Sequence, residues 1–406
     1  MSRTAVAASP LSARAGRLLE QPVRRGDLAL AFPVSTAAGA EIFVEGTSFY
    51  PPMLDDIAAA RSSVHINQFG FKPGVVGDVF AEALTAKAAE GVSVRLVVDN
   101  LGSGPEQGAR THYERLAAGG VKVCVNSASK LRTAAAPLGE TAPRRWNLAS
   151  IGHVDHRKVL IVDGRTGWVG GAGIEDHFND GRFHDVFVRV TGPVVAQLQL
   201  VFVASYRWLG GDVRSEELDD LFPALDEGDD PVPAVVRHNA PGSYRPITSE
   251  ISRLFDDAVE TLDVVNPYVT DRRMIRAIEA AARRGARVRL FTPANGNNWA
   301  CAAAQQFHHG RLLDAGVRIL EYPTMLHAKA FVRDGEELLL GTCNLDAWSL
   351  KRFFEIDLQL WSRALAVQFD ERFSAPAEEI STPGRAASGL KARVKTAAFA
   401  TVSPLL

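Results

Sequence analysis

Two stretches of this chain share one pattern. Residues 156–163 read His-Arg-Lys-Val-Leu-Ile-Val-Asp, and residues 327–334 read His-Ala-Lys-Ala-Phe-Val-Arg-Asp. Both are H-x-K-x4-D, and the offset of 171 persists as far as the pair Gly170 and Gly341. The chain holds only nine lysines, and two of them fall in these motifs, so a chance repetition is a poor explanation. Because the run after each lysine is apolar and ends in Asp-Gly, it predicts a strand followed by a turn.

The motifs lie within alternating strand and helix patterns. We expect helices over 55–60, 79–89, 249–262 and 273–284, and strands over 63–69, 92–98, 264–268 and 286–291. Shorter repeats match 90–96 with 284–290, and 120–123 with 316–319. The patterns predict an α/β protein with two similar units, each a mostly parallel sheet covered on both faces. A pseudo-two-fold axis would relate the units, with a site where equivalent elements meet.

An acidic segment separates the two units. Residues 212–233 are rich in Asp and Glu and end in Pro-Val-Pro, which predicts a solvated linker. We therefore expect an N-terminal tail (1–40), a first domain (41–211), the linker (212–233), a second domain (234–375) and a C-terminal tail (376–406).

The composition excludes several classes of protein. The chain has 406 residues, of which 46% are hydrophobic and 23% charged, as in globular proteins. Its three widely spaced cysteines argue against a disulfide scaffold and a thiolate metal site. A net charge of −2 disfavours nucleic acid as a partner. The apolar stretch 194–204 is too short to span a membrane, and residues 1–25 lack the apolar core of a signal peptide. We expect a cytoplasmic protein without a transmembrane segment.

The motif residues suit chemistry on a phosphodiester. Alternate residues of a strand face the same side, so His156 and Lys158 project together, as do His327 and Lys329. If equivalent strands meet, one histidine can attack phosphorus while the other protonates the departing alkoxide and later deprotonates the incoming alcohol or water. The lysines would offset charge on the non-bridging oxygens. The histidine spacing is not that of a zinc site, and we expect no metal and no cofactor.

The paired motifs resemble the phospholipase D superfamily over residues 45–375. Further stretches resemble its cardiolipin synthase branch: 156–158, 163–164, 170–174, 266–268, 313–317, 325–329, 341–346 and 403–406. The resemblance implies a bilobed α/β/α sandwich fold with the active site between the lobes. It implies transfer of a phosphatidyl group through a phosphohistidine, so that two phosphatidylglycerols give cardiolipin and glycerol. It also implies that His156 is the nucleophile and His327 the acid/base.

Thr342 and Asn344 match positions where the family hydrogen-bonds the phosphate; the alternative is that they are turn residues ending a strand. The first half has Gly171 and Gly173 at the matching positions. Family members usually carry Asn where Gly173 stands. The first half is therefore expected to supply fewer phosphate donors, with backbone N–H groups of the glycine run as substitutes.

Four carboxylates complete the candidate site. Asp185 and Glu355 follow the histidines of their own halves by 29 and 28 residues. Each is expected to accept the Nδ1 proton of that histidine, the alternative being a surface carboxylate. Asp163 and Asp334 close the two motifs, and we expect them to hold the Asp-Gly turn rather than to transfer protons.

Three features lie outside the repeat. The first half has about 25 extra residues around 126–150, which either touch lipid headgroups or form a variable surface loop. Residues 390–402 are basic and apolar, and either lie on an anionic membrane or pack on the domain. The unmatched histidines are expected to be structural or surface groups, with 153 and 184 closest in sequence to the site. They are His65, His112, His153, His177, His184, His238, His308 and His309.

The favoured function is a phosphatidyltransferase of cardiolipin synthase type that acts on phosphatidylglycerol, bound peripherally to the inner face of the cell membrane. The alternative is a phospholipase D-type phosphodiesterase that hydrolyses phospholipid or nucleic acid. A further alternative is a pseudo-enzyme that binds phosphate-rich ligands, which Gly173 supports and two intact His/Lys pairs oppose.

Overall fold

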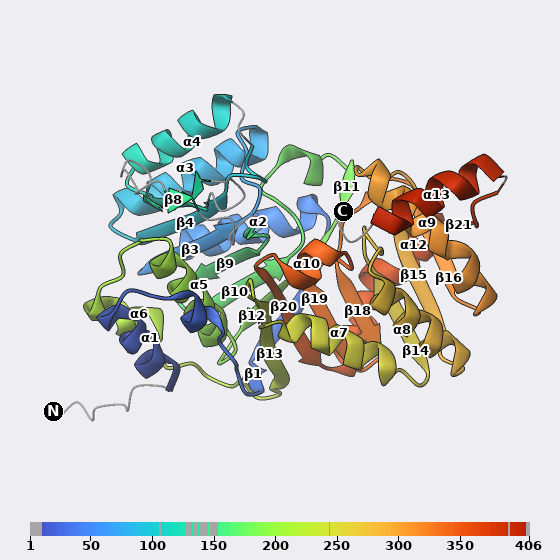
Figure 1. Cartoon of the computed structure of the whole chain (residues 1–406). Coiled ribbons are helices and arrows are strands. Elements are labelled where there is room, and N and C mark those ends of the chain that lie inside the picture. Colours follow the sequence, from blue (N-terminus) through green and yellow to red (C-terminus); the bar gives the residue numbers. More distant parts are fainter. Residues whose placement is uncertain are drawn as a thin grey trace.

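The computed structural model describes residues 10–104, 107–126, 132–133, 136–137, 145–146, 153–242, 244–388 and 390–402. Two large β-sheets form the frame of two lobes. Figure 1 shows most of the first half of the chain, blue to green, on the left and the second half, yellow to red, on the right.

The two sheets have matching strand orders. The first runs β2 (Gly39–Val44), β12 (Val186–Thr191), β10 (Thr166–Gly170), β9 (Lys158–Val162), β3 (Ser63–Gln68), β4 (Ser93–Asp99), β5 (Lys122–Asn126) and β7 (Ala136–Pro137). The second runs β1 (Ser35–Ala37), β13 (Val232–Asn239), β20 (Glu355–Trp361), β19 (Glu337–Gly341), β18 (Ala330–Arg333), β14 (Thr261–Val265), β15 (Arg287–Pro293), β16 (Arg318–Tyr322) and β21 (Thr382–Pro383). Without the edge strands β7, β1 and β21, seven strands of each sheet correspond in order. The two similar units predicted from the sequence are therefore present.

The sheets are mixed, and the prediction of mostly parallel sheets is wrong. Parallel pairing of neighbouring strands occurs in each large sheet only among β3, β4 and β5 in the first and among β14, β15 and β16 in the second. The motif strands β9 and β18 run antiparallel to β3 and β14, and each also turns back at once into a hairpin with β10 or β19. Such hairpins force antiparallel pairing.

Helices cover the outer faces of the sheets. Those of the first lobe are α2 (Gly46–Ala59), α3 (Val75–Ala89) and α4 (Gln107–Ala118); those of the second are α7 (Pro246–Asp256), α8 (Arg272–Arg283) and α9 (Trp299–Asp314). Each set closes an apolar core of its own lobe. A third core is shared: it joins residues of both sheets with α5 (Val195–Trp208) and α11 (Arg363–Phe369). This shared core fixes the lobes against each other and so positions any site between them.

Helix α5 is the apolar stretch noted in the sequence. Its residues from Val195 to Tyr206 are all buried, which explains why it is apolar on every side. The interior glutamines have partners: Gln197 accepts a hydrogen bond from the Val236 N–H at 2.9 Å, and Gln199 lies 2.8 Å from the His65 ring. In the described part of the chain, no helix combines the length and apolar character that a bilayer crossing needs.

Each motif ends in a tight hairpin turn. Asp163 and Gly164 have φ values of 52° and 60°, and Asp334 and Gly335 have 50° and 61°. Two successive positive φ angles give the turn whose twist suits a two-residue hairpin. The Asp163 carboxylate also accepts hydrogen bonds from the backbone N–H groups of residues 61–63, and Asp334 does the same for 259–261. Both aspartates thus occupy the structural position that was expected, because they hold the chain where β3 and β14 begin.

Replacing Asp163 by alanine is expected to lower the free energy of unfolding by about 2–3 kcal/mol, because three N–H groups lose their acceptor and alanine disfavours positive φ. Asparagine, which tolerates this conformation, should cost about 1 kcal/mol. Urea titration measures both, with the exposed Asp229→Ala as control. An Asp163→Ala protein as stable as the control would contradict the anchoring role.

The acid dependence of stability offers a check on the same bonds. Burial raises the pKa of Asp163, but the N–H donors of residues 61–63 outweigh it and hold this pKa below its usual value. The stabilisation is therefore complete above the unfolded value of about 3.9 and is lost as pH falls through the lower folded pKa. In Asp163→Ala this part of the acid transition should disappear.

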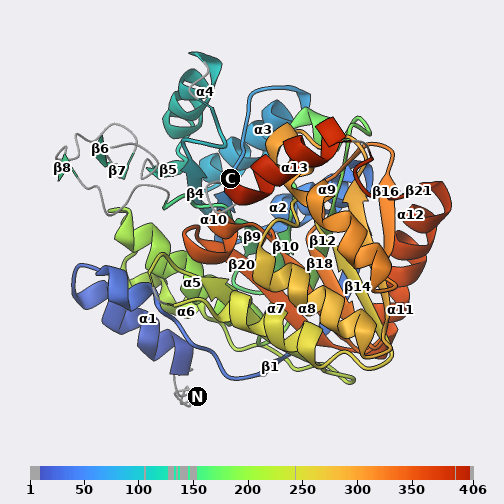
Figure 2. The ribbon, with the colours of Figure 1, turned by 45° about the vertical axis from the view of Figure 1, so that its right-hand side comes forward.

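Several segments expected to be tails are folded. Helix α1 (Pro10–Glu20) contacts α5 and α6 (Leu218–Leu221), as Figure 2 shows. Strand β1 pairs antiparallel with β13, whose edge would otherwise be open. At the other end, β21 pairs with β16, and α13 (Leu390–Val402) packs on α9. Of the two alternatives for 390–402, the structure favours the helix that packs on the domain.

The acidic segment is exposed over much of its length, but part of it is folded onto the first lobe. It contains η4 (Ser215–Glu217) and α6, and Leu221 and Phe222 are buried. The Glu217 carboxylate lies 2.7 Å from the guanidinium of Arg95, which is fully buried in β4. A buried guanidinium needs a counter-charge, and this segment supplies it.

Two further expectations can be compared with the structure. The helix predicted over 249–262 ends at Asp256, because the Asp334 carboxylate draws 259–261 into a turn before β14. The segment 126–150 lies outside the described residues after Asn126, except for β7 and the two-residue strands β6 (Arg132–Thr133) and β8 (Arg145–Trp146). The undescribed part of this segment includes Lys130 and Arg144. The C-terminal residues 403–406 lie outside the described residues as well.

Candidate active site

The backbone of each motif histidine is fixed by the other half of the chain. His156 donates its N–H to the Phe354 carbonyl at 3.0 Å, beside a parallel bridge between Asp155 and Phe354. His327 donates its N–H to the His184 carbonyl at 2.8 Å. That bond continues the parallel pair of β11 (Phe183–His184) and β17 (Met325–Leu326). Both histidines therefore lie at the junction of the lobes.

The carboxylates pair with the histidines across the lobes. The Nδ1 of His156 lies 3.0 Å from Glu355, and the Nδ1 of His327 lies 2.8 Å from Asp185. Both carboxylates are fully buried, so the surface alternative is wrong. The expected pairing within each half is also wrong, because the chain segments that carry Glu355 and Asp185 cross over to pair with the opposite motif. An acceptor at Nδ1 leaves Nε2 of each ring for chemistry.

The two lysines are buried beside these rings. Lys158 and Lys329 are 1% and 0% exposed, and each Nζ donates to the carbonyl of the histidine two residues before it. Burial lowers the pKa of Lys158 to about 7 and that of Lys329 to about 8, and Glu355 and Asp185 oppose the decrease for both. Because carboxylates of both halves act on both lysines, the groups form one electrostatic cluster.

The imidazoles are neutral in the empty cluster. Burial and then the two ammonium groups hold the pKa of His156 well below its usual value, and burial with Lys329 lowers that of His327 to about 3. Burial raises the pKa of Glu355 to about 8. Burial also raises the pKa of Asp185, but the His327 hydrogen bond and Lys329 hold it below its usual range. Asp185 is then the carboxylate that stays ionised beside two ammonium groups, and an anionic phosphodiester would add the charge that balances them.

Thr342 contacts one of the two carboxylates, and Gly171 leaves room for the other. The Thr342 hydroxyl donates to Glu355 at 2.5 Å and accepts from the Ile356 N–H at 2.9 Å. A side chain at Gly171 would overlap the Asp185 carboxylate. The hydroxyl of Thr342 is therefore engaged with Glu355, and its contact with phosphate stays a prediction.

Asn344 and Gly173 differ in what surrounds them. Asn344 is 4% exposed, and its Oδ1 has no hydrogen-bond partner among the described residues. A side chain at Gly173 would overlap the carboxylate of Glu175, two residues further on. The first half therefore has a carboxylate where the second half has an amide.

Aromatic rings around the histidines were missed from the sequence. The Phe69 ring centroid is 4.7 Å from that of His156 and 4.8 Å from the Lys158 Nζ. Phe178 lies 5.4 Å from the ring of His327. A signal existed: 182–185 read Arg-Phe-His-Asp and 352–355 read Arg-Phe-Phe-Glu, an offset of 170. The phenylalanines of these tetrads also cross, since Phe183 lies 5.8 Å from His327 and Phe353 lies 5.9 Å from His156.

Two amides were also missed. Gln68 donates to the Ala172 carbonyl at 2.9 Å, and Asn266 donates to the Cys343 carbonyl at 3.2 Å. These equivalent bonds hold the turns that follow β10 and β19. They therefore fix the backbone on which Gly173 and Asn344 stand.

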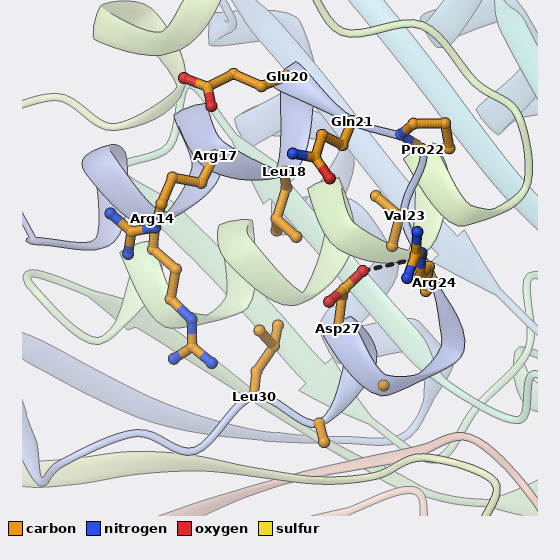
Figure 3. Close-up of a pocket in the computed structure, with 12 residues that line it drawn as sticks. Arg14, Arg17, Leu18, Glu20, Gln21, Pro22, Val23, Arg24, Asp27 and Leu30 are labelled. Carbon is orange, nitrogen blue, oxygen red and sulfur yellow. Dashed lines mark hydrogen bonds between the residues drawn. The ribbon is translucent and has the colours of Figure 1, made fainter.

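Other polar sites do not join this cluster. His153 lies 3.3 Å from Arg25, and His184 pairs with Glu45 at 2.9 Å. A surface cavity of about 490 Å³ lies beside α1 and the loop that follows it (Figure 3), and none of its lining residues belongs to the motifs. Within the described ranges, no group of three or more His, Cys, Asp or Glu side chains could hold a metal ion.

The bilobed arrangement is that of the phospholipase D fold. Phosphatidylserine synthase from Haemophilus influenzae Rd KW20 has a similar structure, with a TM-score of 0.69 at 13% identity over 97% of this chain and 99% of that one. Residues 53–203 and 251–376 match the family model described as "Cardiolipin synthase, PLD-like domain". The chain belongs to this family, and it is an enzyme of the phospholipase D superfamily.

Curated relatives agree with this assignment. The cardiolipin synthase of Geobacillus thermodenitrificans is 29% identical over 359 residues, which are 85% of this chain and 68% of the relative. The probable cardiolipin synthase YwiE of Bacillus subtilis is 23% identical, over 89% of this chain and 71% of the relative. The similarity therefore extends over both lobes.

Proposed function

We propose that the protein joins two phosphatidylglycerols to give cardiolipin and glycerol. The observation that carries the proposal is the pair of histidines at the lobe junction, each with a lysine from its own half and a carboxylate from the other. Membership of the cardiolipin synthase family supports the choice of reaction. Phosphatidylglycerol is an anionic phosphodiester, which suits a cluster with two ammonium groups.

In the first step, the Nε2 of His156 attacks phosphorus while Glu355 accepts a hydrogen bond from Nδ1. The P–O bond to glycerol breaks, and His327 gives its proton to the leaving oxygen. The substrate's negative charge raises the pKa of His327 from its low value in the empty site, so that the imidazolium forms when substrate is bound. Lys158 and Lys329 offset the charge on the non-bridging oxygens.

In the second step, the same groups act in reverse. His327 removes the proton from a hydroxyl of a second phosphatidylglycerol, and the oxygen attacks phosphorus as the bond to His156 breaks. Cardiolipin leaves, and His327 carries the proton for the next cycle. Splitting one displacement into two lowers each barrier and predicts ping-pong kinetics.

Product analysis with phosphatidylglycerol vesicles tests the proposal. We expect cardiolipin and glycerol in equal amounts, and phosphate on the enzyme that is labile to acid and stable to base. Phosphatidic acid as the sole lipid product would replace the transferase with a hydrolase. Binding without any product or phosphoenzyme would identify a pseudo-enzyme.

The rate should fall at alkaline pH. Binding of the phosphodiester needs protonated lysines, whose pKa values of about 7 and about 8 lie well below the usual value because of burial. The fraction of enzyme with both lysines protonated falls as pH rises through the lower value, so kcat/KM should decrease above about pH 7. A profile of kcat/KM that stays flat to pH 10 would contradict the role of the lysines.

We further propose that the protein acts peripherally at the inner face of the cell membrane, where its lipid substrate would be accessible. Co-sedimentation with vesicles of phosphatidylglycerol, and not with vesicles of neutral lipid, is the expected result. Equal binding to both would contradict recognition of anionic lipid.

A further inference from the structure

Glu175 occupies a notch that three glycines leave open. Its carboxylate fills the space where a side chain at Gly70 or Gly173 would stand, and Gly102 lines the same side of Gly70. The second half has Asn344 at the position equivalent to Gly173. Beside the motif strands, the first half thus has a negatively charged carboxylate near the place where the second half has a neutral amide.

The carboxylate is buried but has few partners. Glu175 is 8% exposed, and its polar contacts among the described residues are Lys72 Nζ at 2.9 Å and His177 Nδ1 at 3.8 Å. Both contacts are made by Oε2, whereas Oε1 lies against Gly70 and Gly173. A carboxylate has about four acceptor positions, so capacity remains for a ligand. The side chain of Lys72 is 33% exposed, so the pair is not sealed from solvent.

Aromatic contacts connect the notch to both histidines. Gly70 follows Phe69, whose ring lies against His156 and the Lys158 ammonium. The ring of His177 lies 4.2 Å from that of Phe183, which in turn is 5.8 Å from His327. One aromatic ring, Phe69, thus separates the notch from His156, and two rings, His177 and Phe183, connect Glu175 to His327.

We propose that Glu175, charge-balanced by Lys72, binds the hydroxyl groups of a polyol alcohol, the glycerol part of the lipid head group. This inference rests on the proposed function and specifies which part of the substrate the first lobe recognises. A carboxylate repels a phosphate anion but accepts hydrogen bonds from hydroxyls. The side chain of Asn344 carries an N–H donor and no charge, which suits the phosphate instead. The asymmetry between the lobes thus separates alcohol recognition from phosphate recognition.

The test uses the full-length enzyme with phosphatidyl-p-nitrophenol in mixed micelles. Release of nitrophenol reports formation of the covalent intermediate, and the ratio of transfer product to phosphatidic acid reports how an added alcohol competes with water. Glycerol and 1-propanol serve as acceptors, because 1-propanol lacks the additional hydroxyls. The variants are Glu175→Ala, Glu175→Gln and the exchange Gly173→Asn/Glu175→Gly.

Glu175→Ala and the exchange variant should each lower the glycerol-to-water ratio by about fivefold, the effect of one lost hydrogen bond. In Glu175→Ala the 1-propanol ratio and nitrophenol release should stay within about twofold of wild type, and Glu175→Gln, which keeps an acceptor oxygen, should recover most of the glycerol ratio. The control Asp180→Asn removes an exposed carboxylate that pairs with Arg182 and should match wild type.

The outcomes distinguish this inference from the proposed function. A wild type that gives only phosphatidic acid defeats the transferase and the polyol site together. Normal transfer with an unchanged glycerol ratio in Glu175→Ala overturns the polyol site and leaves the transferase standing. An equal loss with both alcohols, or a matching loss of nitrophenol release, shows a structural role for Glu175 and also overturns the inference.

Discussion

His327→Ala is expected to lower transfer from phosphatidylglycerol by about a thousandfold and yet to leave formation of the phosphoenzyme from phosphatidyl-p-nitrophenol almost intact. The reason is the leaving group. A glycerol alkoxide needs a proton from the acid, whereas nitrophenolate departs without one. His156→Ala removes the attacking nitrogen, so it should abolish the phosphoenzyme from either substrate.

Rapid mixing with acid quench measures both steps, through the nitrophenol burst and the phosphate bound to protein. Circular dichroism and urea titration of each variant exclude unfolding as the cause of a loss. The reverse pattern, in which His156→Ala keeps the burst and His327→Ala loses it, would exchange the two roles. A normal transfer rate in either variant would remove that histidine from the mechanism.

The crossed pairing of the carboxylates gives the second large effect. Glu355→Gln should behave like His156→Ala and lose the burst with nitrophenyl substrate, while Asp185→Asn should behave like His327→Ala and keep it. Each change replaces an acceptor at Nδ1 by a group that can favour the other tautomer, and a loss of about 10²–10⁴ in kcat is expected.

A matched comparison at Thr342 refines this prediction. Thr342→Ser keeps the hydroxyl that donates to Glu355, and Thr342→Val removes it. Only the valine variant should reduce the burst rate, by about tenfold, which corresponds to one lost hydrogen bond. If Asp185→Asn lost the burst and Glu355→Gln kept it, the pairing within each half would hold in solution and the crossed geometry would be wrong.

The duplicated motif was the most informative part of the sequence. The spacing of His156 and Lys158 along a strand predicted a shared face, and the Asp163-Gly164 dipeptide predicted the hairpin turn. Both follow from local backbone geometry, which needs no knowledge of the other lobe. The presence of two similar units was also accessible, because repeats leave matching offsets along the chain.

The partners of the histidines could not be assigned in this way. Asp185 and Glu355 stand at nearly equal distances after the two motifs, and local periodicity does not state which lobe a strand end will meet. The folded state of the acidic segment was hidden for a similar reason: the counter-charge for Glu217 is Arg95, more than a hundred residues earlier. Strand β1 was equally unpredictable, because it belongs to the sheet of the second lobe.

Each carboxylate pairs with the histidine of the other lobe, and this has a consequence for how such a molecule could arise. A half that existed alone would contain a histidine and a lysine but would lack the carboxylate that orients its imidazole. Two copies would have to associate, each supplying the carboxylate for the histidine of the other, before either could react. Fusion of two copies into one polypeptide would make that pairing permanent, and each half could then change independently of the other.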